Sequence, residues 1–535
     1  MASLLVLGGA LTIAYLGLTL VYRVYLHPLA NFPGPFWARV SDLPSYWHTL
    51  KQDRHVWLYQ LQEEYGPSFR YRPDAVLFNT PTAFRHIYGP KGNTKKSDYY
   101  KTWPKNVDAI NTWSATDIPT HARKRRVLNF AFSEKALRAA EPFIHSNTER
   151  WLELMDETII KGNGKEWSAP FNVAEWLNFL VFDILGDLCF GASFEMKEPG
   201  NKLRHIPDLM ITFLGLLHPV ACSPFLEFYL WLKPRGLDWL MEFAAPPAIR
   251  NWSDFVAGCL ADRARVEQEL EKTPKPESEV RKDFFHWLFK AVDPVTGERG
   301  YDLNELYAES ELLIIAGSDT TSIVMSAMMF YLVRNPDAKA KLEHEILSAF
   351  SYDEIRSGAK LNSCTYMHAF ITEAMRMCPP VAAELSRVVL PGGAEVDGRF
   401  IPEGNQCSTS PYCLSYNKDY FPEPFKFRPE RWIVDENDAT GASAEAVAVA
   451  ETAFCTFSSG SRGCVGKNLA WLEMKLVLAK LVYRFELKAD ETNNLGGGDV
   501  NGRPGRRNVH QYQTYDIFVA GRDGPMMHIK PRIRN

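Results

Sequence analysis

One short segment near the carboxyl end constrains this chain more than any other: a cysteine set among closely spaced glycines. Gly460, Gly463 and Gly466 surround Cys464, and a helix-forming run follows at once. Glycines let a loop bend tightly and bring its backbone close to a flat ligand. A cysteine just ahead of a helix lies near free backbone N–H groups, which favour its thiolate. The Cys464 sulfur could therefore be a ligand of haem iron, a redox nucleophile or an ordinary buried thiol.

Composition narrows the class of protein. Of the 535 residues, 46% are hydrophobic, which is typical of a globular chain and too high for a disordered one. The 60 basic and 64 acidic residues give a net charge of −4, so we expect no nucleic-acid partner. The 9 cysteines are too sparse for a disulfide framework, which indicates a reducing compartment.

The amino-terminal end predicts a membrane anchor. Residues 4–22 contain no charged side chain, and that length can span a bilayer as one helix. A cleaved signal peptide is the alternative, but it would have a basic start and a shorter apolar core. Basic residues follow the run and none precedes it, which places the rest of the chain on the cytosolic side. Because Pro33-Gly34-Pro35 makes a stiff joint, we divide the chain into an anchor (1–22), a hinge (23–45) and a body (46–535).

The body is predicted to be mainly α with a small β region. Apolar periodicity and end signals favour helices at 55–65, 133–160, 173–190, 251–272, 281–292 and 303–334. Composition favours short strands at 68–72, 75–79, 387–390, 395–396 and 514–519. The longest helix has an unusual interior, since Gly317, Thr320 and Thr321 are poor helix formers. Threonine hydroxyls can bond backward and bend a helix, so this is either a kinked core helix or an opening beside a reactive group.

Several segments together resemble the cytochrome P450 haem-thiolate monooxygenases. The cysteine loop carries every position of the family's haem-binding pattern: Phe457, Gly460, Arg462, Cys464 and Gly466. Residues 316–321 resemble the family's oxygen-activation segment. Two further motifs occur in the family's order, Glu373-Ala-Met-Arg376 and Phe427-Arg-Pro429-Glu430-Arg431-Trp432, the second with Trp where Phe is more usual.

The resemblance assigns roles to individual residues. It implies one P450 fold in which Cys464 is the axial ligand of the iron of haem b, with Asp319 and Thr320 relaying protons to the bound oxygen. It also implies a buried charge triad of Glu373, Arg376 and Arg431. The haem propionates would bind Arg125, Arg387, Arg462 and His121, where His121 replaces the family's usual Trp. Glu384 and Arg387 repeat the Glu-x-x-Arg spacing, but such pairs are usually solvated.

The implied activity is insertion of one oxygen atom from O2 into an apolar organic substrate. Electrons would come from NADPH through a flavoprotein reductase, at the endoplasmic reticulum membrane. A basic docking face for that reductase, or a merely solvated charged surface, is expected from Arg123, Lys124, Arg126, Lys467 and Lys475. The anchor and residues 121–132 resemble filamentous-fungal members, many of which modify terpenoids, polyketides or alkaloids in secondary metabolism. A haem-thiolate isomerase or dehydratase, or a non-catalytic haem sensor, stays open, although neither needs the Asp319–Thr320 pair.

Apolar residues from distant segments are expected to line the substrate pocket. These are Trp113, Phe213, Leu313, Ala316, Ala382, Ala383 and Met526, the last from a hairpin turn near 521–525.

Overall fold

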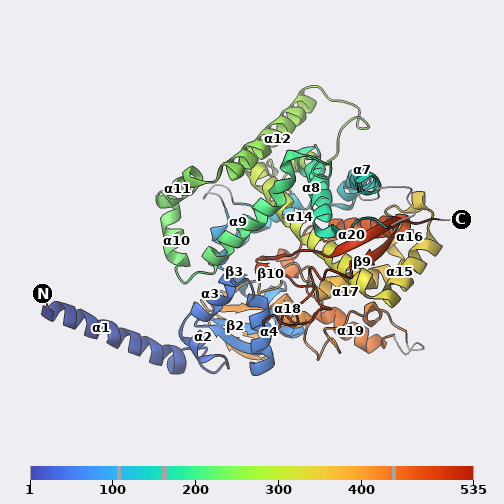
Figure 1. The fold of residues 1–535 in the computed structure, drawn as a ribbon. Coiled ribbons are helices and arrows are strands. Elements are labelled where there is room, and N and C mark those ends of the chain that lie inside the picture. Colours follow the sequence, from blue (N-terminus) through green and yellow to red (C-terminus); the bar gives the residue numbers. More distant parts are fainter. Residues whose placement is uncertain (1, 105–109, 159–166, 436–440, 534–535) are drawn as a thin grey trace.

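Helices make up most of the chain, and the strands are short (Figure 1). The computed structural model describes residues 2–104, 110–158, 167–435 and 441–533. Its helices are α1 (Ala2–Val21), α2 (Phe36–Val40), α3 (Leu43–Leu50), α4 (Arg54–Tyr65), α5 (Pro81–Tyr88), α6 (Ile118–Leu128), α7 (Glu134–Thr158), α8 (Val173–Phe190), α9 (Ile206–Ala221), α10 (Leu226–Leu232), α11 (Leu237–Ala244), α12 (Pro247–Lys272), α13 (Phe284–Lys290), α14 (Leu303–Arg334), α15 (Pro336–Ala349), α16 (Ala359–Asn362), α17 (Thr365–Met377), α18 (Pro411–Ser415), α19 (Ala444–Ala453) and α20 (Lys467–Arg484).

In the described part of the chain, the strands form one five-stranded sheet and three smaller ones. The larger sheet has the order β1-β2-β8-β5-β3, from β1 (Ser68–Arg72), β2 (Ala75–Phe78), β8 (Gln406–Ser408), β5 (Arg387–Val389) and β3 (Thr94–Lys96). A second sheet has the order β4-β12-β9, from β4 (Phe171–Asn172), β12 (Met526–Pro531) and β9 (Phe485–Ala489). Two hairpins pair β6 (Ala394–Val396) with β7 (Arg399–Ile401), and β10 (Tyr515–Ile517) with β11 (Val519–Gly521). The prediction of a mainly helical chain with a small β region is confirmed.

Helix α14 runs through the middle of the body (Figure 1). It begins with a capping box, in which the Asp302 side chain accepts from Glu305 and the Glu305 side chain accepts from Asp302. It ends at Asn335 because Pro336 lacks the N–H that would continue the ladder. Most of its residues are buried, and it packs against α8, α17 and α20. Although α14 is long and apolar enough to cross a bilayer, its burial makes it the core of the body.

Helix α1 is different, because it projects away from the body (Figure 1). The span Leu5–Leu26 contains an 18-residue window with a mean hydropathy of 1.9, none of which is buried, as a membrane-spanning helix requires. Residues 33–35 are non-helical, as predicted, and the backbone N–H of Arg70 in β1 donates to Pro33 O at 2.7 Å. Arg39 donates to the carbonyls of Val24 and Ala30. The division into anchor, hinge and body stays a prediction, but the joint is held against the sheet.

The carboxyl-terminal hairpin differs from the prediction. The expected single strand at 514–519 is two strands with their turn at Phe518, whose φ of 81° lies in the left-handed region. The Asp516 side chain accepts from the Phe518 N–H at 3.2 Å and supports that turn. Met526 was expected in the hairpin turn, but it lies in β12 opposite Asn172 of β4. The apolar alternation of 514–519 does not reveal this reversal, because its cause is one backbone angle.

Candidate active site

The cysteine loop is shaped by a close backbone approach. Gly460 has a φ of +65°, and a Cβ there would lie 2.2 Å from the carbonyl oxygen of Tyr88. Only glycine tolerates both conditions. The backbone N–H of Cys464 donates to Phe457 O at 2.8 Å, and α20 begins three residues later. The Cys464 side chain is exposed at the end of this loop.

The Cys464 thiol is subject to opposing influences. Desolvation by the surrounding chain raises its pKa. The backbone N–H groups of Gly466 and Lys467 and the charges of Arg125 and Lys467 lower it. The predicted helix-terminal N–H groups are therefore present at the sulfur, although desolvation exceeds their effect on the free thiol.

Four basic side chains from three segments gather at this loop. Arg125 of α6 donates to Gly463 O at 2.6 Å, and Arg462 donates to Ala115 O at 2.5 Å. Arg387 of β5 donates to Ser386 O at 3.0 Å. His121 of α6 is buried. All four predicted propionate-binding residues thus belong to one cluster.

The members of this cluster repel one another. Burial, and then the charges of Arg462, Lys96, Arg125 and Arg387, lower the pKa of His121 to about 3. Burial and Arg387 lower the pKa of Arg462 to about 10, against the opposing effect of the exposed Asp117. Such an excess of buried positive charge favours a ligand that carries more than one negative charge.

Lys96 is a member of the cluster that the sequence did not reveal. It lies in β3, and its Nζ donates to Trp113 O at 2.5 Å. Burial, together with Arg387, Arg462 and Arg125, holds its pKa well below the ordinary value. The signal was weak, because Lys96 follows another lysine in a three-residue strand that carries no motif.

The predicted proton-relay segment lies in the middle of α14. The helix is continuous from Leu303 to Arg334, and the Thr320 hydroxyl donates backward to Ala316 O at 2.8 Å. The backward hydrogen bond of the Thr320 hydroxyl is as expected, but it does not open or break α14. Close packing explains the glycine at position 317, since a Cβ there would lie 2.9 Å from the Leu185 side chain of α8. Burial raises the pKa of Asp319 to about 6, against the lowering charge of Arg522.

The predicted charge triad is assembled and fully enclosed. Glu373 accepts from Arg376 Nε at 2.8 Å and from Arg431 Nε at 2.9 Å. Trp432 also donates its indole N–H to Glu373, at 2.9 Å. The two guanidinium groups hold the pKa of Glu373 at about 2 in spite of its burial.

Comparison with known proteins decides the family. The family model described as "Cytochrome P450" matches residues 33–496. The chain belongs to the cytochrome P450 family. It is 34% identical over 518 residues to the cytochrome P450 monooxygenase fscF of Fusarium equiseti, covering 96% of this chain and 94% of that protein. It is 34% identical to the monooxygenase apf7 of Gibberella fujikuroi (96% and 95% covered) and 32% identical to AKT7 of Alternaria alternata (98% and 96% covered).

Membership establishes the class of chemistry. This P450 is a haem-thiolate monooxygenase, and the isomerase and sensor alternatives are not favoured by relatives that are named monooxygenases. The residues present fit the cofactor, because a cysteine exposed beside a carboxylate-poor cation cluster suits an iron with two propionates. Among the described residues, no group of three or more His, Cys, Asp or Glu side chains suits a separate metal ion.

The substrate candidates of this P450 are distributed unevenly. Ala316 is exposed one turn before Thr320, and Trp113 packs edge-on against Phe518 with ring centroids 5.1 Å apart. Leu313, Ala382 and Ala383 are buried in core clusters, whereas Phe213 is 40% exposed on α9. Phe518, which contacts Trp113, was not among the residues predicted to line the pocket.

Glu384 is not a solvated partner of Arg387. It pairs with Arg54 of α4, and both side chains are almost fully buried.

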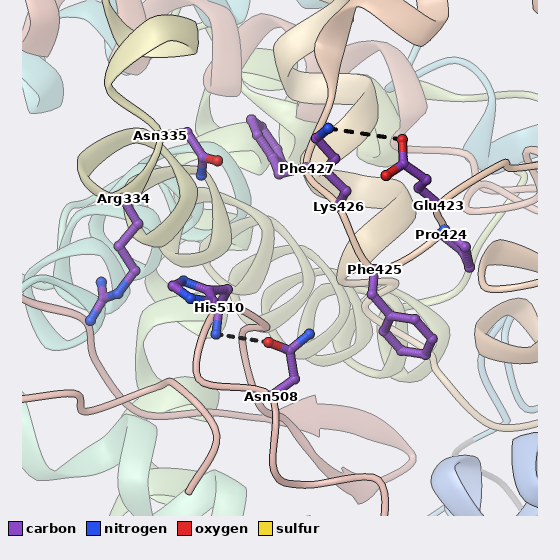
Figure 2. A pocket seen from close by; sticks show the side chains of 9 residues that line it. All are labelled: Arg334, Asn335, Glu423, Pro424, Phe425, Lys426, Phe427, Asn508 and His510. Atoms are coloured by element: carbon purple, nitrogen blue, oxygen red, sulfur yellow. Dashed lines mark hydrogen bonds and ion pairs between the residues drawn. The ribbon is translucent and has the colours of Figure 1, made fainter. Parts of the chain in front are cut away.

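A separate cavity of about 440 Å³ lies at the carboxyl end of α14 (Figure 2), between Arg334, Phe427 and His510. None of the predicted catalytic, cofactor or substrate residues lines that cavity.

Proposed function

We propose that this P450 is a membrane-anchored enzyme of fungal secondary metabolism that oxidises a bulky, apolar terpenoid, polyketide or alkaloid with electrons from NADPH, delivered by a flavoprotein reductase. The observation that carries the catalytic part is the cation cluster around the Cys464 loop, which holds several basic groups with little compensating acid. The metabolic part rests on likeness to the fungal monooxygenases.

Each site residue has one task in this proposal. Bound haem supplies the dioxygen and one-electron chemistry. The Cys464 thiolate ligates the iron, and Arg125, Arg387 and Arg462 orient the ring by charge-assisted hydrogen bonds to its propionates. Asp319 holds a proton that it can release near neutral pH. Thr320, the next residue, offers a hydroxyl that can pass the proton onward.

The task of Thr320 is tested by Thr320→Ala. This variant is expected to load haem normally but to release several-fold more hydrogen peroxide per NADPH, because proton delivery fails. Thr212→Ala is the matched control, since the exposed Thr212 hydroxyl makes the same backward bond in α9, to Asp208 O at 2.8 Å. Wild-type peroxide release in Thr320→Ala would remove that residue from the mechanism.

The membrane placement has support beyond α1. Large apolar side chains are exposed on α10 and α11, and others on α2 and α3. Figure 1 draws these helices on the side of the body from which α1 leaves. The exposed residues are Phe225, Phe228, Trp231, Trp239 and Phe243 on or next to α10 and α11, and Trp37, Leu43 and Trp47 on α2 and α3. An apolar patch of this kind favours contact with lipid, which in this proposal is the cytosolic face of the endoplasmic reticulum.

The expected basic face for the reductase is reduced by the structure. Lys467 is exposed, but Lys475 is buried and donates to Asn362 at 3.0 Å. Lys124 is buried beside Glu305 and Glu309. The proposal of a reductase partner therefore rests on the family's need for electrons. Lys467 is an exposed candidate contact, and the other two candidates, Arg123 and Arg126, are paired with Glu305 and Asp293.

The substrate is tested by expressing the chain in yeast with a reductase and profiling products from a library of fungal metabolites. The expected result is NADPH-dependent gain of one oxygen atom in an apolar member of the library. Product formation without NADPH, or haem-loaded protein that consumes no NADPH with any member, would contradict the proposal.

A further inference from the structure

Arg522, just beyond β11, reaches from the carboxyl-terminal hairpin into the central helix. Its Nη2 donates to the Ser322 hydroxyl of α14 at 2.6 Å and also to the side-chain oxygen of Asn178 of α8. The Ser322 hydroxyl and Asn178 are themselves 2.8 Å apart, and both residues are buried. One charged side chain thus connects three elements that are far apart in the sequence.

This connection is made one turn from Asp319. Positions 319 and 322 share a face of α14, and the Ser322 hydroxyl is 3.2 Å from Asp319 O. Both carboxylate oxygens of Asp319 are buried and have no hydrogen-bond partner within the described chain, and Arg522 Nε is in the same situation. Buried, unpartnered polar atoms are costly and call for a functional reason.

The positive charge of Arg522 opposes the effect of burial on the pKa of Asp319. Burial raises the pKa of Asp319, and Arg522 holds the result at about 6. Nearby groups do not titrate in the same range. Burial raises the pKa of Cys378 to about 12 and also raises the pKa of Tyr512. It raises the pKa of Glu473 of α20, which bonds to Thr321, to about 8.

We propose that Arg522 is a positioning residue for Asp319: it ties the hairpin to α14 at Ser322 and supplies the positive charge that lets the buried carboxyl release and regain its proton. The proposal rests on the relay role of Asp319 in the proposed function. The next residue along the chain, Asp523, is exposed and accepts from Asn172 at 2.7 Å. The cluster therefore lies one residue from solvent, where protons are available.

The first test measures the carboxyl directly. The full-length haem-loaded protein is titrated while the infrared C=O stretch of protonated carboxyls is recorded, and Asp319→Asn identifies the band. Arg522→Gln is expected to move its midpoint upward by about one pH unit, because an adjacent opposite charge shifts a carboxyl by about 1–3 units. Arg522→Lys, which keeps the charge, should retain most of the wild-type midpoint. Arg265→Gln, an exposed arginine of α12, is the control and should change nothing.

The second test measures proton delivery without requiring a known substrate. With reductase and NADPH, oxygen is reduced either to hydrogen peroxide, using one NADPH, or to two waters, using two NADPH. Arg522→Gln is expected to raise the peroxide-to-water ratio up to about tenfold, as one pKa unit implies, and Arg522→Lys to raise it less.

The outcomes separate the two proposals. If Asp319→Asn leaves the peroxide-to-water ratio unchanged, the relay role itself is wrong. If Asp319→Asn raises the ratio but Arg522→Gln matches wild type in midpoint and ratio, the Arg522 proposal is overturned. If Arg522→Gln does not load haem, Arg522→Lys and Ser322→Ala decide, with the Asp319 band identified in each by comparison with Asp319→Asn. If the midpoint of that band is displaced as far in Arg522→Lys, which keeps the charge, as in Ser322→Ala, the charge of Arg522 has no part.

Discussion

Replacing Glu373 by Gln should destabilise this P450 more than any exposed substitution. The Glu373 carboxylate accepts two hydrogen bonds from Arg376, one from the Arg431 guanidinium, one from the backbone N–H of Arg428 and one from Trp432, all between 2.8 and 3.0 Å. Glu373 and Arg376 are fully buried and Arg431 nearly so. The substitution leaves two buried guanidinium groups without their counter-charge, which is the expensive case.

The magnitude follows from the pKa of Glu373. It falls from 4.5 to about 2 in the folded protein. At about 1.4 kcal/mol per unit, the charged form contributes about 3 kcal/mol, and breaking a buried pair costs about 3–5 kcal/mol. Because the folded pKa is lowered, this contribution is present above pH 4.5 and is lost as the pH falls toward 2. The difference between wild type and Glu373→Gln should therefore narrow below pH 4.5.

The assay is chemical denaturation of the full chain in detergent, followed by tryptophan fluorescence between pH 7 and the most acidic pH at which wild type stays folded. Glu134→Gln is the control, because Glu134 and its partner Arg138 are 85% and 71% exposed and such pairs contribute less than about 1 kcal/mol. The reasoning is refuted if Glu373→Gln lies within 1 kcal/mol of wild type at pH 7, or if the difference does not narrow in acid.

Three further predictions concern the cofactor site. Gly460→Ala should weaken haem binding, measured by titration of apoprotein, because its Cβ would meet Tyr88 O at 2.2 Å; Gly258→Ala, where no atom lies within 4 Å, should not. Lys96→Met should speed haem loss to a haem-scavenging globin while raising the thermal midpoint of the apoprotein, since it removes one mutually repelling charge; an unchanged rate of loss would exclude Lys96 from the site. Cys464→Ser should abolish the red-shifted Soret band of the reduced carbon-monoxide complex, and retention of that band would refute the ligand assignment.

The long elements were predictable because their signals are local. The predicted ranges 173–190 and 303–334 are those of α8 and α14, whose first turns are capped by Asn172 and Asp302. The predicted helix at 133–160 agrees with α7 up to Thr158, and its last two residues lie outside the described ranges. Strands such as β8 were missed because they exist through pairing with β2, more than 300 residues away. Residues 441–453 are rich in small residues, which is typical of a surface loop, yet they contain α19, which begins at a Ser443 cap.

Partnerships of charged residues were less predictable than motifs. Glu373 and Glu384 have the same spacing to an arginine, but one pairs with Arg376 and the other with Arg54, 330 positions away. Lys124 sits among basic neighbours and was expected at a surface, yet it is buried against Glu305. Spacing along a helix says which residues share a face, and not which other element covers that face.

The cation cluster connects folding with cofactor loading. Lys96, His121, Arg387 and Arg462 come from segments that close around the Cys464 loop. The charges of Lys96, Arg387 and Arg462 each lower the pKa of at least one other member, and all three lower the pKa of His121. Bringing them together costs free energy unless anions compensate them, because buried positive charges repel and lose hydration. In the proposed function, two propionates would provide that compensation, so haem that binds only the closed arrangement would stabilise the fold by mass action. The groups proposed to recognise the cofactor would then also make the folded state depend on it.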